Sequence, residues 1–269
     1  LLFSFLGYLG FLYFYLFAVK KIKYKHKAFG VDLMVLFMFL PNMHFWSVSL
    51  GKGSIILLGI CLILYGLGRF PNRIIPLAIG TIIVFHVRSH ILMIMLVGLF
   101  LSMMVTSKGI RWYQKLIMLV LCGALIVPVS DTFFSYIQMQ EVTESSVDNF
   151  LSHRGTQLTK ATSGVAISQY NQFQRIATFL FRPIFIDAPN ALGLIVSFEN
   201  LLYVILFIRV IRVQFLRYIW QTDWLNWLCL FTFMGATFAL AQISGNMGLA
   251  LRQKSQIMFL FLVIFLQYG

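Results

Sequence analysis

Residues 74–107 read IIPLAIGTIIVFHVRSHILMIMLVGLFLSMMVTS, and Arg88 is the only formally charged side chain among them. Two apolar runs, 74–87 and 90–107, flank the polar segment that contains Arg88. A membrane-crossing helix needs about 17–25 mostly apolar residues, and fewer where it is broken or re-entrant. The stretch therefore predicts two short spans joined by a tight turn at Arg88. A re-entrant half-helix is the alternative for 74–87.

The rest of the chain has the same composition. Of its 269 residues 60% are hydrophobic and 11% are charged, whereas an ordinary soluble domain has about 25% charged residues. So few polar side chains cannot cover a water-exposed surface, which excludes a soluble enzyme, a nucleic-acid-binding domain and a secreted disulfide scaffold. Cys61, Cys122 and Cys229 lie within apolar runs and are expected to be buried free thiols. No metal-ligand spacing occurs, and we expect neither a metal nor a cofactor.

We expect an all-α, polytopic transmembrane helix bundle of about nine spans. The predicted spans are 1–19, 31–50, 54–68, 74–87, 90–107, 113–130, 191–208, 224–243 and 256–269. They divide the chain into an N-terminal bundle (1–130), a long loop (131–190) and C-terminal helices (191–269), which form one structural unit. The first run precedes a lysine cluster rather than a small-residue cleavage site, so we expect an anchor and not a signal peptide. Because the chain starts at Leu1, these spans need not be the full set.

The orientation follows from the basic residues in short loops, which concentrate on the cytoplasmic side. The densest cluster contains Lys20, Lys21, Lys23, Lys25 and Lys27, so we place that loop in the cytoplasm. With nine spans, three further basic loops fall on the same side: Arg69/Arg73, Lys108/Arg111/Lys115 and Arg209/Arg212/Arg217. Most acidic residues fall on the opposite side: Asp131, Glu141, Glu144, Asp148 and Asp187.

The loop 131–190 is the longest stretch without a span, and this orientation places it outside the membrane. Within it, 141–180 mixes charged residues with regularly spaced apolar ones, which indicates one or two amphipathic helices over the mouth of the bundle. A passive solvated linker is the alternative. Loops of this length in compact proteins are usually functional or disordered, and the aromatic residues here favour order.

Six outer residues are candidates for an anion-binding site. Ionisable groups at membrane depth cost about 2.5–3.5 kcal/mol each on insertion scales, so they usually have a function. The candidates are His44, Lys52, Arg88, Arg182, Arg252 and Lys254. The first two lie in the Pro- and Gly-containing break 41–53, and the last two lie in the glycine- and amide-containing segment 245–254. The alternatives are a snorkelling arginine in a turn and a local pair of Arg182 with Asp187.

A candidate for acid–base chemistry lies in the outer loop. His153 and Arg154 follow Glu141, Glu144 and Asp148, so an imidazole, a cation and carboxylates lie close together in the sequence. His153 or Glu141 could take a proton from a hydroxyl group. A salt-bridged loop helix is the alternative. Within a later span, Glu199 is expected to hydrogen-bond a neighbouring helix or to pair with an outer cation.

The succession PNMHFWSVSLGK (41–52), HVRSH (86–90), Arg182-Pro183 and GNMGLALRQK (245–254) resembles bacterial O-antigen and exopolysaccharide repeat-unit polymerases. The resemblance implies a multi-pass protein of the bacterial inner membrane that polymerises polyprenyl-diphosphate-linked oligosaccharides at the periplasmic face. It also implies a membrane glycosyltransferase whose partners include membrane lipid, chain-length regulators and flippases, with no nucleic acid. The layout matches over most of the chain, whereas the residues match only in these short stretches.

On this reading, the outer cations hold the diphosphate as substrate and as leaving group. Charge grows on the diphosphate as the glycosidic bond breaks, so fixed cations stabilise the transition state more than the ground state. An O-antigen ligase reaction would use the same site with another acceptor. A transporter or flippase of the same lipid would lack the chemistry, and it should show internal repeats and midplane charges. A non-catalytic assembly subunit would have scattered cations.

Overall fold

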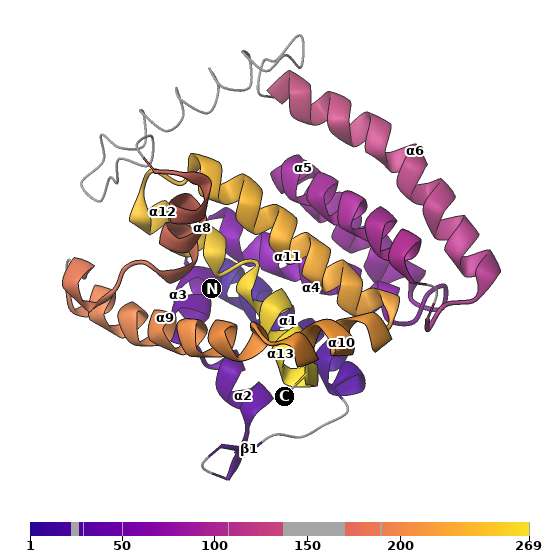
Figure 1. Ribbon diagram of the computed structural model, residues 1–269. Coiled ribbons are helices and arrows are strands. Elements are labelled where there is room, and N and C mark those ends of the chain that lie inside the picture. The colour runs from indigo at the N-terminus through magenta and orange to yellow at the C-terminus, as the bar shows by residue number, and fades with distance from the viewer. Residues whose placement is uncertain are drawn as a thin grey trace.

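The computed structural model describes residues 1–22, 27–28, 30–49, 51–106, 108–136, 170–188 and 190–268. These residues are mostly helical, and their only sheet is a two-stranded hairpin, β1 (Lys27–Ala28) with β2 (Val31–Asp32). The N-terminal helices are α1 (Leu2–Lys21), α2 (Leu33–Met38), α3 (Pro41–Val48), α4 (Lys52–Leu67), α5 (Ile74–Val105) and α6 (Trp112–Tyr136). The later elements are α8 (Gln172–Phe181), the 3-10 turn η2 (Phe185–Asp187), α9 (Ala191–Val210), α10 (Val213–Gln221), α11 (Trp224–Ile243), α12 (Met247–Lys254) and α13 (Met258–Tyr268) (Figure 1).

Among the described residues, five helices are long and apolar enough to cross a membrane: α1, α5, α6, α9 and α11. Two bent pairs, α3 with α4 at 109° and α12 with α13 at 49°, would bring the number to seven if each pair were one span. The protein is therefore an all-α, multi-pass helix bundle. The long apolar runs fold as helices because a lipid environment leaves backbone N–H and C=O groups no other partner.

The long helix α5 folds back on itself at Arg88, where the backbone leaves helical geometry with φ −152° and ψ 78°. Leu77 from the first half lines the same cavity as Leu96 from the second half. A straight helix would separate these two residues by about 28 Å, because it rises 1.5 Å per residue. Consistently, Nε2 of Gln114, which follows α5, donates to the carbonyl of Phe70, which precedes it, at 3.0 Å. The predicted runs 74–87 and 90–107 thus lie side by side as the two halves of α5.

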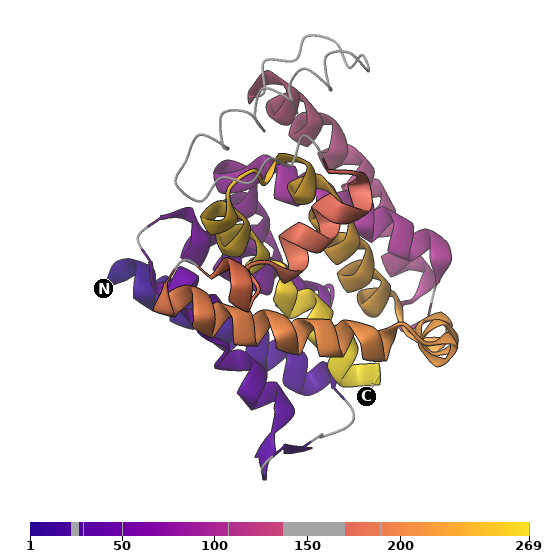
Figure 2. The ribbon, with the colours of Figure 1, turned by 60° about the vertical axis from the view of Figure 1, so that its left-hand side comes forward.

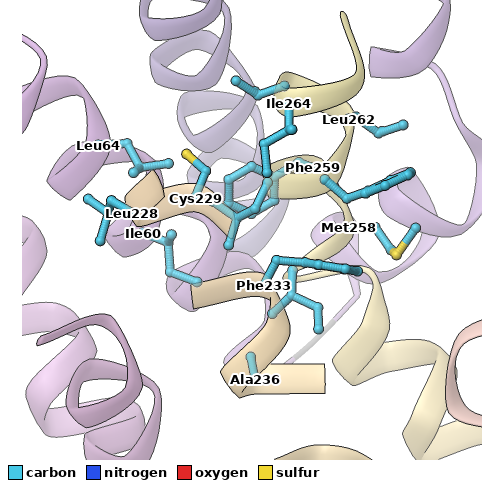
Figure 3. Close-up of a cluster of buried hydrophobic side chains, with 14 of the residues drawn as sticks. Ile60, Leu64, Leu228, Cys229, Phe233, Ala236, Met258, Phe259, Leu262 and Ile264 are labelled. Atoms are coloured by element: carbon cyan, nitrogen blue, oxygen red, sulfur yellow. The ribbon is translucent and has the colours of Figure 1, made fainter. Parts of the chain in front are cut away.

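Buried apolar side chains hold the bundle together. Where α4, α11 and α13 meet, Ile60, Leu64, Leu228, Cys229 and Phe259 pack against one another, each at most 1% exposed (Figure 3). α6 packs mainly against α5 and lies at the edge of the bundle (Figure 1). Between α6 and helices α4, α5 and α11 lies an apolar cavity of about 190 Å³. All three cysteines are free and buried, as predicted.

The predicted basic loops meet at one end of the bundle, which we name the Lys21 end. Lys21 forms an ion pair with Asp223, and its backbone carbonyl accepts a hydrogen bond from Nε2 of Gln267 at 3.1 Å. The carbonyl of Lys108 accepts from the backbone N–H of Trp224 at 3.3 Å, and the Lys108 ammonium donates to the carbonyl of Trp220 at 3.2 Å. Lys20 lies within electrostatic reach of Arg69 and Arg73. Four loops that are distant in the sequence therefore share one face, with the C-terminus of α13 beside them (Figure 2).

The loop 131–190 is described only in part. Its second half contains α8, which buries Phe179 and Leu180 and exposes Phe173. An Asn171–Gln174 capping box begins this helix. One amphipathic helix is thus present in the predicted stretch 141–180, and 137–169 lie outside the described residues.

Candidate functional site

Three cations from separate segments gather at the end of the bundle opposite the Lys21 end. They are Lys52 at the start of α4, Arg88 at the fold-back of α5 and Arg252 in α12. Arg88 and Arg252 lie within electrostatic reach of each other, and both Arg88 and Lys52 lie within reach of His90. We call these four residues the Arg88 cluster.

The bend between α3 and α4 creates one wall of this site. Gly51 has a φ of +135°, a conformation that residues with a side chain rarely adopt. A Cβ atom at Gly51 would lie only 2.6 Å from Nη2 of Arg252. The glycine therefore serves two purposes, because it allows the 109° bend and makes room for the guanidinium.

Arg252 approaches this wall from α12. Asn246 caps the start of α12 by accepting a hydrogen bond from the backbone N–H of Leu249 at 3.1 Å. The guanidinium carbon of Arg252 lies 5.7 Å from the ring centre of Trp46, within the range of a cation–π contact. Trp46, which lies in α3 before the bend, thus forms a side wall of the site.

In the cluster and in the segments that follow Lys52 and Lys254, several buried polar atoms have no hydrogen-bond partner among the described residues. They are Nη1 of Arg88, Nε of Arg252, Oγ of Ser54 and both amide atoms of Gln256. Nε2 of Gln256 lies 3.7 Å from where a Cβ atom on Gly53 would be, so this amide is next to the bend. Each unsatisfied buried polar group costs about 1–3 kcal/mol, so the arrangement favours a polar or anionic ligand at this position.

The charge of the cluster supports the same conclusion. Lys52, Arg88 and Arg252 carry three positive charges, and in the described ranges none of them pairs with a carboxylate. Like charges held together in a membrane protein repel one another unless an anion lies between them. Guanidinium groups bind phosphate oxygens in a bidentate manner, so a phosphate or diphosphate matches this site chemically.

The structure engages the other three predicted anion ligands elsewhere. His44 Nε2 hydrogen-bonds the carbonyl of Met38 at 2.6 Å, and its ring stacks on Phe11 with centroids 4.4 Å apart. Lys254 is fully buried and donates to the carbonyl of Leu180 at 2.9 Å and to Oδ1 of Asn200 at 2.5 Å. Neither side chain joins the Arg88 cluster.

Arg182 forms the local ion pair that was the alternative interpretation of its position. Its Nε and Nη2 donate to the two carboxylate oxygens of Asp187 at 2.7 and 2.9 Å, and Nη1 donates to Tyr170 Oη at 3.4 Å. These hydrogen bonds lower the pKa of Asp187 below its usual value and raise that of Arg182. Arg182 could offer the same two donors to an anion only by giving up this bidentate pair.

The two predicted proton acceptors, His153 and Glu141, lie outside the described residues. Ser54 and Gln256 were not predicted, although both follow a lysine at the polar edge of an apolar run. Glu199 hydrogen-bonds a neighbouring helix, the first of its two predicted alternatives: its Oε2 accepts from the backbone N–H of Asn42 in α3 at 2.8 Å.

Comparison of the chain with protein-family models, curated proteins and solved structures gives no match. The geometry of the Arg88 cluster and the character of the bundle therefore carry the functional interpretation.

Proposed function

We propose that the protein is a membrane glycosyltransferase that joins polyprenyl-diphosphate-linked oligosaccharide repeat units into O-antigen or exopolysaccharide at the periplasmic face of a bacterial inner membrane. The observation that carries this proposal is the Arg88 cluster, in which three cations and several buried polar atoms converge without a carboxylate partner in the described ranges. An amphiphile with a diphosphate headgroup matches a cationic site at one end of an apolar bundle.

In the proposed reaction the bond between the donor sugar and the diphosphate breaks, and its electron pair stays on the diphosphate oxygen. The hydroxyl oxygen of the acceptor sugar forms the new glycosidic bond and loses its proton to a base. Arg88, Arg252 and Lys52 stabilise the charge that grows on the leaving diphosphate. Proposed candidates for the base are His153 and Glu141.

We also propose nine membrane crossings, which are α1, α2 together with α3, α4, each half of α5, α6, α9, α11, and α12 together with α13. The fold-back of α5 supports this number, because it returns the chain to the Lys21 end before α6 begins. In this arrangement the Lys21 end is cytoplasmic and the Arg88 cluster is periplasmic, in agreement with the positive-inside rule.

A test of this orientation uses single cysteines. Lys52→Cys should react with a membrane-impermeant thiol reagent added from the periplasmic side, and Lys108→Cys should react only from the cytoplasmic side, because the two exposed residues lie at opposite ends. The native cysteines are buried and give little background. Labelling of both variants from the same side would contradict the nine crossings.

Reconstitution tests the activity itself. Purified protein in proteoliposomes that contain a lipid-linked repeat unit should produce longer glycans on the same lipid. Transfer of the glycan to another acceptor, without longer chains on the lipid, would indicate a ligase. Movement of the lipid between leaflets without any new glycosidic bond would indicate a flippase and would refute the proposed polymerase.

A further inference from the structure

A polar network is buried where α3, α9 and α12 meet, next to the Arg88 cluster. Its side chains are Asn42, Glu199, Asn200, Tyr203 and Lys254, and none is more than 4% exposed. Charged and polar groups inside a membrane protein are costly, so a fully satisfied network of this kind usually has a function. None of these five residues belongs to the proposed diphosphate site.

Glu199 fixes the start of α3. Its Oε2 accepts from the backbone N–H of Asn42 at 2.8 Å, and its Oε1 accepts from the hydroxyl of Tyr203 at 2.5 Å. Asn42 is the second residue of α3, where backbone N–H groups lack partners within the helix. A carboxylate at this position also interacts favourably with the helix dipole.

The same network fixes α12 on both sides of Arg252. The side-chain amide of Asn42 donates to the carbonyl of Leu251 at 3.2 Å, directly before Arg252. Two residues after Arg252, the Lys254 ammonium is anchored by Asn200 and by the carbonyl of Leu180. Glu199 also lies within electrostatic reach of that ammonium.

We infer that Glu199 is a positioning residue for the diphosphate site. It fixes the start of α3 directly, and it fixes the backbone of α12 through Asn42 and Lys254. Together these contacts place the Arg252 guanidinium beside Gly51 and Trp46. This inference rests on the proposed function at one point, the binding of diphosphate by Arg252. Glu199 is not itself such a ligand, because α3 and α9 engage both of its oxygens.

A first experiment needs no ligand. In a chain with Arg252→Cys as its only reactive thiol, Glu199→Gln should change the rate of thiol labelling at position 252 by about threefold or more, because α12 loses an anchor. Lys108→Cys is the matched control, since this exposed residue lies at the opposite Lys21 end and takes no part in the network, and its labelling rate should not change. An unchanged rate at position 252 would overturn the inference, whatever the protein binds.

A second experiment measures the affinity of the detergent-purified protein for inorganic diphosphate by calorimetry. Glu199→Gln should weaken binding about fivefold in the otherwise unchanged protein and should have no further effect in the Arg252→Ala background, because contacting groups are non-additive. In the Arg88→Ala background the fivefold loss should persist. An equal loss in the Arg252→Ala background would overturn the inference.

The two experiments separate this inference from the proposed function. If labelling at position 252 changes while the unsubstituted protein binds no diphosphate, the proposed function fails and the positioning of α12 by Glu199 stands. Tyr203→Phe is a milder variant that removes one hydrogen bond and keeps the carboxylate. It should shift both readouts in the same direction by a smaller factor, which excludes general misfolding of Glu199→Gln as the cause.

Discussion

Arg88→Ala should reduce glycan elongation in proteoliposomes by about 10²- to 10³-fold, the range measured when one preorganised donor to a developing anion is removed from an active site. Arg88 is the central cation of the cluster: it lies at the fold-back of α5 and within electrostatic reach of Arg252. Its Nη1 is buried and has no partner among the described residues, so the guanidinium has a donor available for the proposed diphosphate ligand.

The loss should be mainly in the turnover rate, because in the proposed reaction the charge on the diphosphate grows as the glycosidic bond breaks. Arg88→Lys should recover only part of the activity, since an ammonium cannot bind two phosphate oxygens in the planar bidentate geometry of a guanidinium. The measurement is glycan length per unit time at saturating lipid-linked repeat unit, normalised to inserted protein.

Arg209→Ala is the matched control for this prediction. Arg209 is an exposed arginine in the last turn of α9, which places it towards the Lys21 end. Its substitution should leave elongation within about twofold of the original rate, because a surface charge contributes little. Equal activity of Arg88→Ala and the unsubstituted protein would remove Arg88 from the mechanism.

Much of the fold could be predicted because hydrophobic runs and the lipid environment determine helices almost independently of their neighbours. The apolar runs predicted α1, α4, α6, α9 and α11 closely. The polar interruption around Arg88 predicted the fold-back of α5, since a charge between two short apolar runs is stable only at a helix end or inside the bundle.

Which residues belong to the Arg88 cluster was harder to predict, because this depends on the direction in which each side chain points. Arg252 and Lys254 are two residues apart in α12, so their side chains point about 200° apart around the helix axis. Arg252 faces Gly51 and Trp46, while Lys254 faces α9. The spacing of the two residues predicts that their side chains point in nearly opposite directions, but it does not show which side chain faces the site.

Local partners also removed predicted ligands from the site. His44 finds the carbonyl of Met38 six residues earlier, and Arg182 finds Asp187 five residues later. Both contacts form around a proline-containing break, where free backbone and side-chain groups lie close together. The short spacing of Arg182 and Asp187 in the sequence identified their pairing as an alternative. Only the folded backbone shows whether Arg182 pairs with Asp187 or binds an anion.

Two glycines in apolar helices look equivalent in the sequence and should respond to alanine in opposite directions. Gly80 lies where α5 packs against α4: a Cβ atom there would be 2.7 Å from the carbonyl oxygen of Gly59 and 2.9 Å from the backbone nitrogen of Ile63. A Cβ atom at Gly123 of α6 would have no neighbour within 4 Å. Close approach of backbones through small residues is a main source of helix association in membranes.

Gly80→Ala should therefore lower the stability of the bundle by about 1–3 kcal/mol, the usual cost of overpacking, because rigid backbone atoms cannot move away from the new methyl group. Gly80→Val should prevent correct assembly. Gly123→Ala should leave the stability unchanged or raise it by up to about 1 kcal/mol, since alanine restricts the unfolded chain and favours the helix.

Thermal unfolding in detergent, followed by the reactivity of the buried native cysteines, measures both effects in one assay, because Cys61 in α4 and Cys122 in α6 become accessible as the helices separate. The contrast between the two variants is the decisive quantity, since both add the same methyl group to a glycine of an apolar helix. Destabilisation of similar size in Gly80→Ala and Gly123→Ala would mean that the chemical change itself, and not the contact between α4 and α5, determines the cost. In that case the close packing of α5 on α4, which directs Arg88 toward Lys52 and Arg252, would not be a principal source of stability in this bundle.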